Sequence, residues 1–453
     1  MSSARCKKRR ARHQWSTAFA SCAASYFMLA QAAMLDPDAS TTLIARMGGA
    51  ARQAAAVLAT APDALKADAL RRAADALRAD GAMILAANAI DVARGHEAGL
   101  SDAMLDRLRL DPARFEAIAA GVAAVADLAD PVGQVIDYAT RPNGLTLSRV
   151  RVPIGVIGII YESRPNVTAD AAALCVRAGN AVILRGGSEA IESNGAIHAA
   201  MTKGITAAGL PAEAVQLVST TDRAAVGAML AADGLIDLIV PRGGKSLVAR
   251  VQAEARVPVL AHLDGINHVF VHASAAPDMA RSIVLDAKMR RTGICGAMET
   301  LLIDRDFVDP VMLVEALQQA GCEVRGDSFE ASIGEIVTPV EPADWDTEYL
   351  DAICSVALVD GVDAALAHIA RHGSGHTDAI VAADAAIAEH FLARCDSAIV
   401  LWNASTQFAD GGEFGLGAEI GIATGRLHAR GPVALEGLTT YKWLGRGSGQ
   451  VRG

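Results

Sequence analysis

Aromatic side chains are scarce in this chain of 453 residues: Phe, Trp and Tyr make up 4% of it, whereas hydrophobic residues make up 52%. The apolar side chains are therefore mainly Ala, Val, Leu and Ile, which are typical of helices packed on buried parallel strands. At roughly 100–200 residues per domain, the length predicts two or three domains. These features favour an α/β fold and exclude a peptide hormone or a small disulfide-bonded protein.

Positive charge is also in deficit. Lys and Arg number 41 against 51 Asp and Glu, which gives a net charge of -10, and no basic stripe occurs beyond residue 35. A nucleic-acid backbone therefore has no cationic surface to bind, and we expect no nucleic-acid partner. No window after the N-terminal region is long and apolar enough to cross a bilayer, so we expect no membrane partner.

Cysteine is sparse, and its spacing suggests no pairing. The seven cysteines are odd in number and form no Cys-x-x-Cys pair: Cys6, Cys22, Cys175, Cys295, Cys322, Cys354 and Cys395. This pattern indicates neither a disulfide framework nor a thiolate zinc site, and it favours a reducing cytoplasm.

The first 34 residues differ from the rest. A basic cluster is followed by a weakly apolar stretch, as in a signal peptide, but Ser16, Ser21 and Gln31 are among the polar residues that interrupt it. We favour a disordered extension, or a mis-assigned start with Met34 as the true one, over an export signal.

The order of predicted elements indicates the architecture. Three or four amphipathic helices are expected from Thr42 to about Asp130, and residues 133–152 alternate around a turn as a β-hairpin. Strand-like runs then alternate with helical patterns at 155–161, 181–186, 214–219, 235–240, 258–263 and 267–272, and a second series begins near Glu299. Repeated βαβ units predict two α/β domains with parallel sheets and a glycine-rich tail at 405–453.

Two glycine-rich turns follow predicted strands. One is Arg185-Gly186-Gly187-Ser188, and the other is Gly243-Gly244-Lys245-Ser246, which opens a helix. Backbone amides at such turns bind anions, so both are candidate phosphate sites. Neither matches a nucleotide-binding fingerprint, and a tight structural turn is the alternative for each.

Cys295 is the best candidate nucleophile. Glycines lie close to it on both sides, and Arg290, Arg291 and Lys288 precede it. These neighbours predict an accessible thiol with a pKa below the usual value of about 8.5. A structural cysteine is the alternative. The cysteines at 175, 354 and 395 lie in apolar runs and are expected to be inert core residues.

Histidine offers a competing site. His368, His372 and His376 are four residues apart, so two of them could share a helix face and bind a metal. Gly373 and Gly375 would end the helix before His376, however, and no third ligand has suitable spacing. We therefore predict no metal.

Several long motifs occur together in order: VPIGVIGIIYESRPNVTADAAALC, DLIVPRGGKSLVARV, the Cys295 segment, RHGSGHTDAI and GLGAEIGIATGRLHARGPVALEGLTTYKW. From about Thr42 to Gln450 the chain resembles the gamma-glutamyl phosphate reductases of the aldehyde dehydrogenase superfamily. This resemblance implies a Rossmann-type NADP-binding domain (35–262) that carries a β-hairpin oligomerisation element, a catalytic domain (263–404), and a tail (405–453) completing the cofactor and oligomerisation regions.

The resemblance also implies the reaction, NADPH-dependent reduction of L-glutamyl 5-phosphate to L-glutamate 5-semialdehyde and phosphate, the second step of proline biosynthesis. Cys295 would form a thioester that accepts hydride. Its backbone amide and Asn166 would stabilise the oxyanion. Aldehyde-oxidising relatives carry a hydrolytic glutamate where this chain has His262, and the loss of that base protects a thioester from water. His262 could itself act as an acid or a base, but we do not assign it that role.

The cofactor assignment follows from the two glycine-rich turns. Arg185 and Ser188 resemble the adenosine-ribose positions, where serine beside arginine suits a 2′-phosphate and favours NADP(H) over NAD. By resemblance the cofactor contacts are Arg185, Gly186, Gly187, Ser188, Gly243, Gly244, Lys245, Ser246 and Glu348.

The substrate needs cationic or amide donors, and the candidates are Arg290, Arg291, His376, Thr377 and Arg426. We expect a homodimer or homotetramer, and glutamate 5-kinase is a potential partner for transfer of the labile acyl phosphate. A coenzyme A-linked aldehyde dehydrogenase and a catalytically silent nucleotide-binding protein remain as alternatives.

Overall fold

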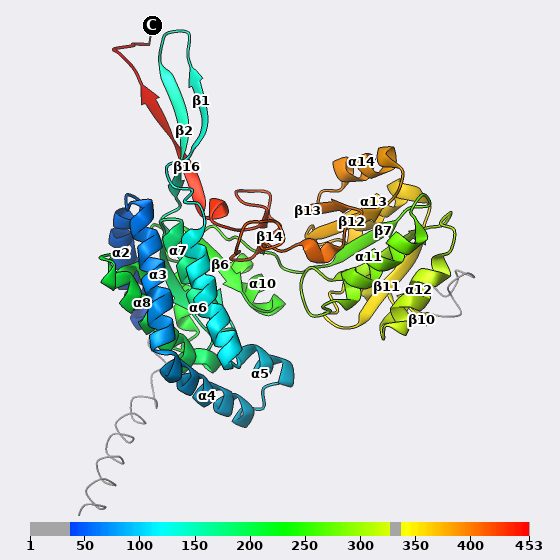
Figure 1. The fold of residues 1–453 in the computed structure, drawn as a ribbon, viewed down its shortest axis with the longest axis horizontal. Helices are drawn as coiled ribbons and strands as arrows, with labels where there is room; N and C mark the ends of the chain where they lie inside the picture. Colours follow the sequence, from blue (N-terminus) through cyan, green and yellow to red (C-terminus); the bar gives the residue numbers. More distant parts are fainter. Residues whose placement is uncertain (1–36, 327–336, 453) are drawn as a thin grey trace, which may run out of the picture.

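Two α/β lobes and a projecting β arm make up the computed structural model, which describes residues 37–326 and 337–452 (Figure 1). The predicted extension at 1–34 lies outside the described residues. Both large sheets are wholly parallel, so the predicted α/β class is confirmed. No helix among the described residues is long and apolar enough to cross a membrane.

The first lobe contains a four-stranded sheet in the order β5-β4-β3-β6. Its strands are β3 (Val156–Tyr161), β4 (Ala181–Arg185), β5 (Val215–Leu217) and β6 (Leu238–Arg242). Every residue of β3 and β4 is buried, which explains why these strands read as continuous apolar runs rather than alternating ones. Because β4 and β6 are the parallel neighbours of β3, the carboxyl ends of these three strands lie side by side at one edge of the sheet.

Helices surround this sheet, and α2 and α7 pack directly on β3 and β4. They are α2 (Pro37–Leu58), α3 (Asp63–Ala79), α4 (Gly81–Glu97), α5 (Asp102–Leu108), α6 (Pro112–Asp127), α7 (Asn166–Arg177), α8 (Ile191–Ala207), α9 (Ala224–Leu230) and α10 (Lys245–Glu254).

Between Pro37 and Asp127 the structure has five helices, not the three or four predicted from the periodicity of Thr42 to about Asp130. Side-chain caps create the extra boundaries: Ser101 accepts from Met104 N, and Asp111 accepts from Arg114 N. Such caps satisfy the free amides of a new first turn, so one Ala-rich stretch divides into short helices.

The second lobe contains a seven-stranded sheet in the order β10-β9-β11-β8-β7-β12-β13. Its strands are β7 (Asn267–Val271), β8 (Met298–Asp304), β9 (Glu323–Gly326), β10 (Thr338–Pro339), β11 (Ile353–Val359), β12 (Thr377–Val381) and β13 (Ile399–Trp402). Its helices are α11 (Pro277–Met289), α12 (Pro310–Gln319), α13 (Gly361–His372) and α14 (Ala385–Arg394).

Two strand predictions near the junction of the lobes need correction. Residues 258–263 do not form a strand, because only Val259 makes a bridge, to Ile239. The run at 267–272 contains β7, which lies between β8 and β12 of the second sheet and so does not extend the first series. Pro258 and Leu260 each form one backbone hydrogen bond with Ile239 of β6, and the chain then leaves this sheet and crosses to the other lobe.

The arm consists of β1 (Val135–Thr140), β2 (Thr146–Pro153) and β16 (Thr439–Arg446). The hairpin predicted at 133–152 is present, and β16 pairs antiparallel with β2 along its whole length. The arm projects from the first lobe in Figure 1 and leaves Tyr138 and Trp443 largely exposed. Strands β14 (Ile422–Ala423) and β15 (Gly431–Pro432) form a small separate sheet.

Short 3-10 helices complete the described secondary structure. They are Ser188–Ala190, Ala212–Ala214, Pro342–Asp346, Thr406–Phe408 and Glu436–Leu438.

Helices α3 and α8 approach closely at Gly204, where a Cβ would lie 2.2 Å from the backbone nitrogen of Ala73. We expect Gly204→Ala to push the helices apart and lower the free energy of unfolding by about 1–3 kcal/mol. Gly195 is the matched control in the same helix, because its Cβ would meet nothing within 4 Å. Gly195→Ala is expected to be neutral or to stabilise by about 0.5–1 kcal/mol. Equal melting temperatures for the two variants would contradict this packing.

Candidate active site

The loop that carries Cys295 connects α11 to β8 and is held by the segment that crosses between the lobes. Asn267 donates from Nδ2 to the carbonyl oxygens of Cys295 (2.6 Å) and Ala297 (2.8 Å). A Cβ at Gly265 would lie 2.3 Å from the Cys295 carbonyl oxygen, so only glycine fits there. These contacts place the thiol at a fixed position beside the crossing segment.

The environment of the Cys295 thiol differs from the sequence prediction. The side chain is partly accessible, yet protein atoms replace most of the surrounding water, and this burial raises its pKa to about 11. Arg242 lowers the pKa, whereas Glu348 and Glu419 raise it further. The expected lowered pKa is therefore wrong, because desolvation of the thiolate outweighs the nearby positive charge.

The cation that acts on the thiol also comes from an unexpected place. Arg242 ends β6 in the first lobe. Arg290 precedes Cys295 closely in sequence, but its Nη1 lies 3.5 Å from Gln407 Oε1 instead. Arg164 is a second cation whose charge interacts with Cys295, and burial lowers its pKa. Sequence reasoning gave neither arginine a role beside the thiol: Arg242 was considered only as a charge at the second glycine-rich turn, and Arg164 lies in the same SRPN motif as Asn166.

Two histidines lie beside the thiol. One ring nitrogen of His262, one of His376 and the Cys295 Sγ all lie within 4.8 Å of one another. His262 Nδ1 lies 2.7 Å from the Ile422 carbonyl oxygen, which fixes its proton there and leaves Nε2 as the acceptor. Burial lowers the pKa of both histidines, that of His376 to about 3, so both imidazoles are neutral near pH 7. Both are therefore unprotonated, but a pKa of about 3 makes His376 too weak a base for the thiol, which leaves His262 as the candidate proton acceptor.

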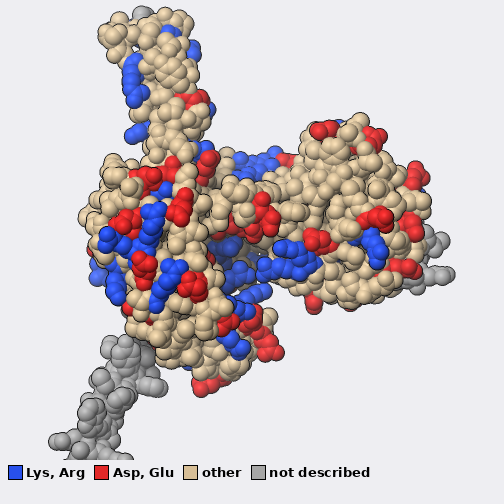
Figure 2. Space-filling model, viewed as in Figure 1, with Lys and Arg blue, Asp and Glu red and all other residues tan. Residues whose placement is uncertain are grey.

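Asn166 begins α7, and its Nδ2 donates to Asp170 Oδ2 at 2.8 Å. Burial raises the pKa of Asp170 to about 6, although Asn166 and Arg242 both lower it. Because Arg242 acts on Asp170 and on Cys295, these groups share one electrostatic environment. Figure 2 shows Lys and Arg gathered in the hollow between the lobes. The charges of Arg242, Arg107 and Arg291 all lower the pKa of Arg164.

The turn after β4 contains the first predicted cofactor contacts. Arg185 donates from Nη2 to the Thr221 carbonyl oxygen (3.1 Å), and its buried Nε has no hydrogen-bond partner among the described residues. Ser188 is exposed. The turn is tight, because a Cβ at Gly186 would lie 2.1 Å from Asn194 Nδ2 and one at Gly187 would lie 2.2 Å from Glu189 Oε1.

The second turn opens α10. The Gly244 amide donates to Glu162 Oε2 (3.2 Å), and Lys245 Nζ forms an ion pair with Asp264 (3.0 Å). Glu348 accepts from the Gly265 amide (3.0 Å), and its charge interacts with those of Lys245 and the Cys295 thiolate. The tertiary structure thus brings Glu348 between the second glycine-rich turn and the nucleophile.

The predicted substrate residues are distributed unevenly. His376 is beside Cys295, and Thr377 supports it: the Thr377 Oγ1 lies 2.8 Å from His376 Nδ1, and its amide donates to Asn267. The charge of Arg291 acts on Arg164. Arg426 is largely exposed and forms an ion pair with Asp396.

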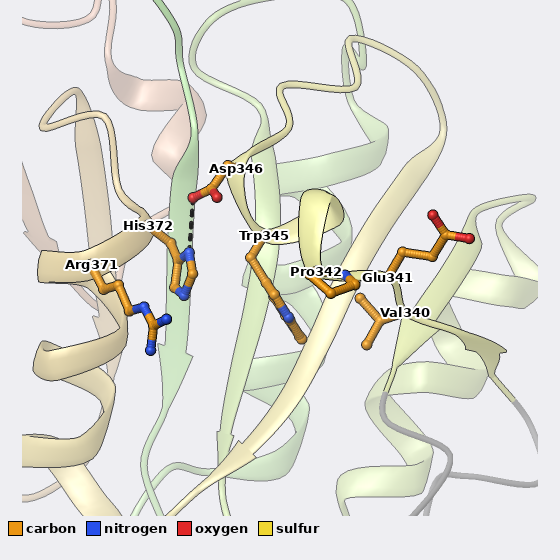
Figure 3. Close-up of a pocket in the computed structure, with 7 residues that line it drawn as sticks. All are labelled: Val340, Glu341, Pro342, Trp345, Asp346, Arg371 and His372. Atoms are coloured by element: carbon orange, nitrogen blue, oxygen red, sulfur yellow. Dashed lines mark hydrogen bonds and ion pairs between the residues drawn. The ribbon is translucent and has the colours of Figure 1, made fainter.

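The three regularly spaced histidines do not converge. His368 and His372 contact each other on α13, with ring centroids 4.7 Å apart, whereas His376 packs against His262 at 5.0 Å. His372 lines a separate cavity of about 500 Å³ and bonds to Asp346 there (Figure 3). None of the predicted catalytic, cofactor or substrate residues lines this cavity.

Comparison with known proteins agrees with this geometry. The aldehyde dehydrogenase family model matches residues 35–340. The gamma-glutamyl phosphate reductase of Novosphingobium aromaticivorans is 71% identical over 415 residues, covering 92% of this chain and 98% of that protein. The chain belongs to the gamma-glutamyl phosphate reductases of the aldehyde dehydrogenase family.

Other reductases of this family agree. That of Rhizorhabdus wittichii is 70% identical over 413 residues, covering 91% of this chain and 96% of that protein. The crystal structure of the Thermotoga maritima gamma-glutamyl phosphate reductase superposes with a TM-score of 0.89 at 41% identity, covering 90% of this chain and all of that one. The family, fold and enzyme class predicted from the motifs are therefore confirmed.

The charges around Cys295 give a test by alkylation. We expect Arg242→Gln to raise the pKa of the thiol and slow its reaction with iodoacetamide severalfold near about pH 8, because one pKa unit changes the thiolate fraction about tenfold. Arg290→Gln is the matched control and is expected to react like the wild type. Labelling of Cys295→Ala gives the background. Slower reaction of the Arg290 variant alone would favour the sequence prediction instead.

Proposed function

We propose that this enzyme reduces L-glutamyl 5-phosphate with NADPH, through a Cys295 thioester, to L-glutamate 5-semialdehyde and phosphate. The observation that carries the proposal is that Cys295 lies beside two neutral imidazoles and within electrostatic range of Arg242 and Arg164 of the first lobe. The relatives are named gamma-glutamyl phosphate reductases, which supports the substrate and its reduction. This reaction would be the second step of proline biosynthesis.

The thiol first loses its proton to the Nε2 of His262, the nitrogen left free by the bond from Nδ1 to Ile422. Cys295 Sγ then attacks the acyl carbonyl, the carbon–sulfur bond forms, and the bond to the phosphate oxygen breaks. A thiol with a pKa of about 11 needs such a base, because little thiolate exists near neutral pH without one. Arg164 and Arg291 stabilise the departing phosphate through charge.

Negative charge develops on the acyl oxygen at each carbonyl step. The Cys295 backbone amide and the Asn166 side chain supply the donors. Asp170 occupies one hydrogen of the Asn166 Nδ2 and so fixes the amide, while the second hydrogen stays available for the oxyanion. After reduction the oxyanion re-forms the carbonyl as the carbon–sulfur bond breaks, which releases the aldehyde, and protonated His262 returns its proton to the departing Cys295 sulfur.

The residues at the carboxyl ends of β4 and β6 fit NADP(H). Bound NADPH supplies the hydride that reduces the thioester. The buried, unpartnered Nε of Arg185 and the exposed hydroxyl of Ser188 suit a 2′-phosphate. The Ser163 hydroxyl donates a hydrogen bond to the Glu189 carboxylate, which weakens the repulsion between that carboxylate and a bound 2′-phosphate. The pyrophosphate would be held by Gly243, Gly244, Lys245 and Ser246, and the nicotinamide ribose by Glu348.

The glutamyl portion of the substrate requires further donors. We assign this portion to residues that lie near the nucleophile in sequence or in space, namely Arg290, Arg291, His376 and Thr377. Arg426 is the outermost candidate. Thr377 acts through His376, because its hydroxyl contacts that ring and its side chain is buried.

The arm is the proposed contact between subunits. Tyr138, Tyr441 and Trp443 lie exposed on its strands, and a second copy would cover them in a homodimer or homotetramer. We also place the enzyme in the cytoplasm and propose glutamate 5-kinase as a partner that delivers the labile acyl phosphate.

The reaction can be tested in reverse, which avoids the rapid cyclisation of the acyl phosphate. We expect purified enzyme to form NADPH from NADP and glutamate semialdehyde only when phosphate is present, and expect Cys295→Ala to lose this activity. Cys354→Ala, which alters a buried core thiol, is the matched control and should stay active. Turnover without phosphate would indicate a hydrolytic aldehyde dehydrogenase, and dependence on coenzyme A would indicate an acylating one. NADP binding without turnover would indicate a silent nucleotide-binding protein.

Cofactor choice gives a second test. We expect Ser188→Glu to lower kcat/KM for NADP at least about tenfold, because a carboxylate beside the 2′-phosphate repels it at a cost of more than about 1 kcal/mol. Activity with NAD should be unchanged or higher. Ser188→Ala keeps the site uncharged and is expected to fall between wild type and Ser188→Glu. Equal losses with both cofactors would argue against this assignment.

A further inference from the structure

The geometry points to a second use of the catalytic cleft: we propose that Cys295, His262 and His376 together bind a zinc-type divalent cation that reversibly blocks the enzyme. The proposed reaction needs no metal, so this site would regulate or poison the thiol and would take no part in catalysis.

The distances suit such a site. The three ligand atoms lie within 4.8 Å of one another. Zinc–sulfur and zinc–nitrogen bonds of about 2.3 and 2.0–2.1 Å in a tetrahedron place ligand atoms roughly 3.3–3.6 Å apart. The ligand atoms therefore need to approach one another by at most about 1.5 Å. Two imidazoles and one thiolate leave a fourth position for water.

Both imidazoles are already oriented as metal ligands are. His262 Nδ1 bonds to the Ile422 carbonyl oxygen, and His376 Nδ1 bonds to the Thr377 hydroxyl, which leaves the Nε2 of each ring for a ligand. Outer hydrogen bonds of this kind fix ring orientation in metal sites. The Nε2 of His376 is buried and has no hydrogen-bond partner among the described residues. A buried polar atom without a partner is costly, and a metal ion would satisfy it.

The electrostatic surroundings permit a cation. Both histidines are neutral, so neither must lose a proton. The groups that act on the thiol from other elements are Arg242 and Arg164, which oppose a cation, and Glu348 and Glu419, which favour one. Binding converts the thiol and the ion into a metal thiolate and one released proton, so no electron is transferred. Soft and borderline ions such as Zn²⁺ and Co²⁺ suit this ligand set, whereas Mg²⁺ and Ca²⁺ prefer oxygen.

The site can be tested by direct binding to the whole protein. Zn²⁺ is titrated against a chromophoric chelator with metal-free wild type, and Co²⁺ is titrated while the sulfur-to-cobalt charge-transfer band is recorded. We expect one ion per chain, and expect Cys295→Ser to lose the cobalt band. Since loss of outer-sphere contacts alone weakens metal binding about 10–100-fold, His262→Ala and His376→Ala should weaken it about 100-fold or more.

Two matched controls alter similar side chains elsewhere. His372→Ala removes a histidine bonded to Asp346, and Cys354→Ser removes a buried thiol; both should bind Zn²⁺ like the wild type. Melting curves show which variants fold. If His376→Ala does not fold, His376→Gln is used in its place. Unchanged affinity in the folded Cys295, His262 and His376 variants overturns the proposal, as does loss of affinity in the His372 control.

Inhibition supplies an independent arm. We expect Zn²⁺ to stop NADPH formation in the reverse assay, a chelator to restore it, and Mg²⁺ to have no effect. The binding measurements need no turnover, so they remain decisive even if the enzyme acts on a different substrate. Tight Zn²⁺ binding with full activity would overturn the claim that the ion blocks the thiol.

Discussion

The active site depends on the close contact between the backbones of Gly265 and Cys295. No Cβ fits at Gly265, and Asn267, two residues further on, holds the Cys295 carbonyl oxygen. The same short segment carries His262, which faces the thiol, and the Gly265 amide that binds Glu348. One crossing between the lobes therefore positions the nucleophile, a proton acceptor and a candidate cofactor contact, because all three are fixed relative to the same few peptide units.

Burial, more than charge, sets the character of the nucleophile. The thiolate form of Cys295 is disfavoured by the loss of water, and Arg242 offsets only part of this cost. The same burial keeps His262 and His376 neutral and lowers their pKa values, so His376 is too weak a base to take the proton of the thiol. A thiol kept protonated is protected from modification, because the thiol is far less nucleophilic than the thiolate.

Local patterns predicted the regular elements well where one short stretch determines them. The apolar runs of β3 and β4, the hairpin of β1 and β2, and the end of α13 at His372 all follow from neighbouring residues. Prediction failed where the cause was not local. Periodicity missed the capped ends that divide the N-terminal helices. The apolar run at 258–263 pairs with β6 only at Val259 and then leaves the sheet to cross between the lobes.

By itself the sequence determined the family, the α/β fold and the identity of the candidate nucleophile, because motifs and hydrophobic patterns are carried by residues close together in the chain. The tertiary structure alone decided which groups surround Cys295. Arg242, Arg164 and Glu348 lie far from it in sequence, and His262 and His376 meet it only through the crossing segment and the start of β12. Electrostatic and desolvation effects depend on distances in space, and no pattern along the chain encodes those distances.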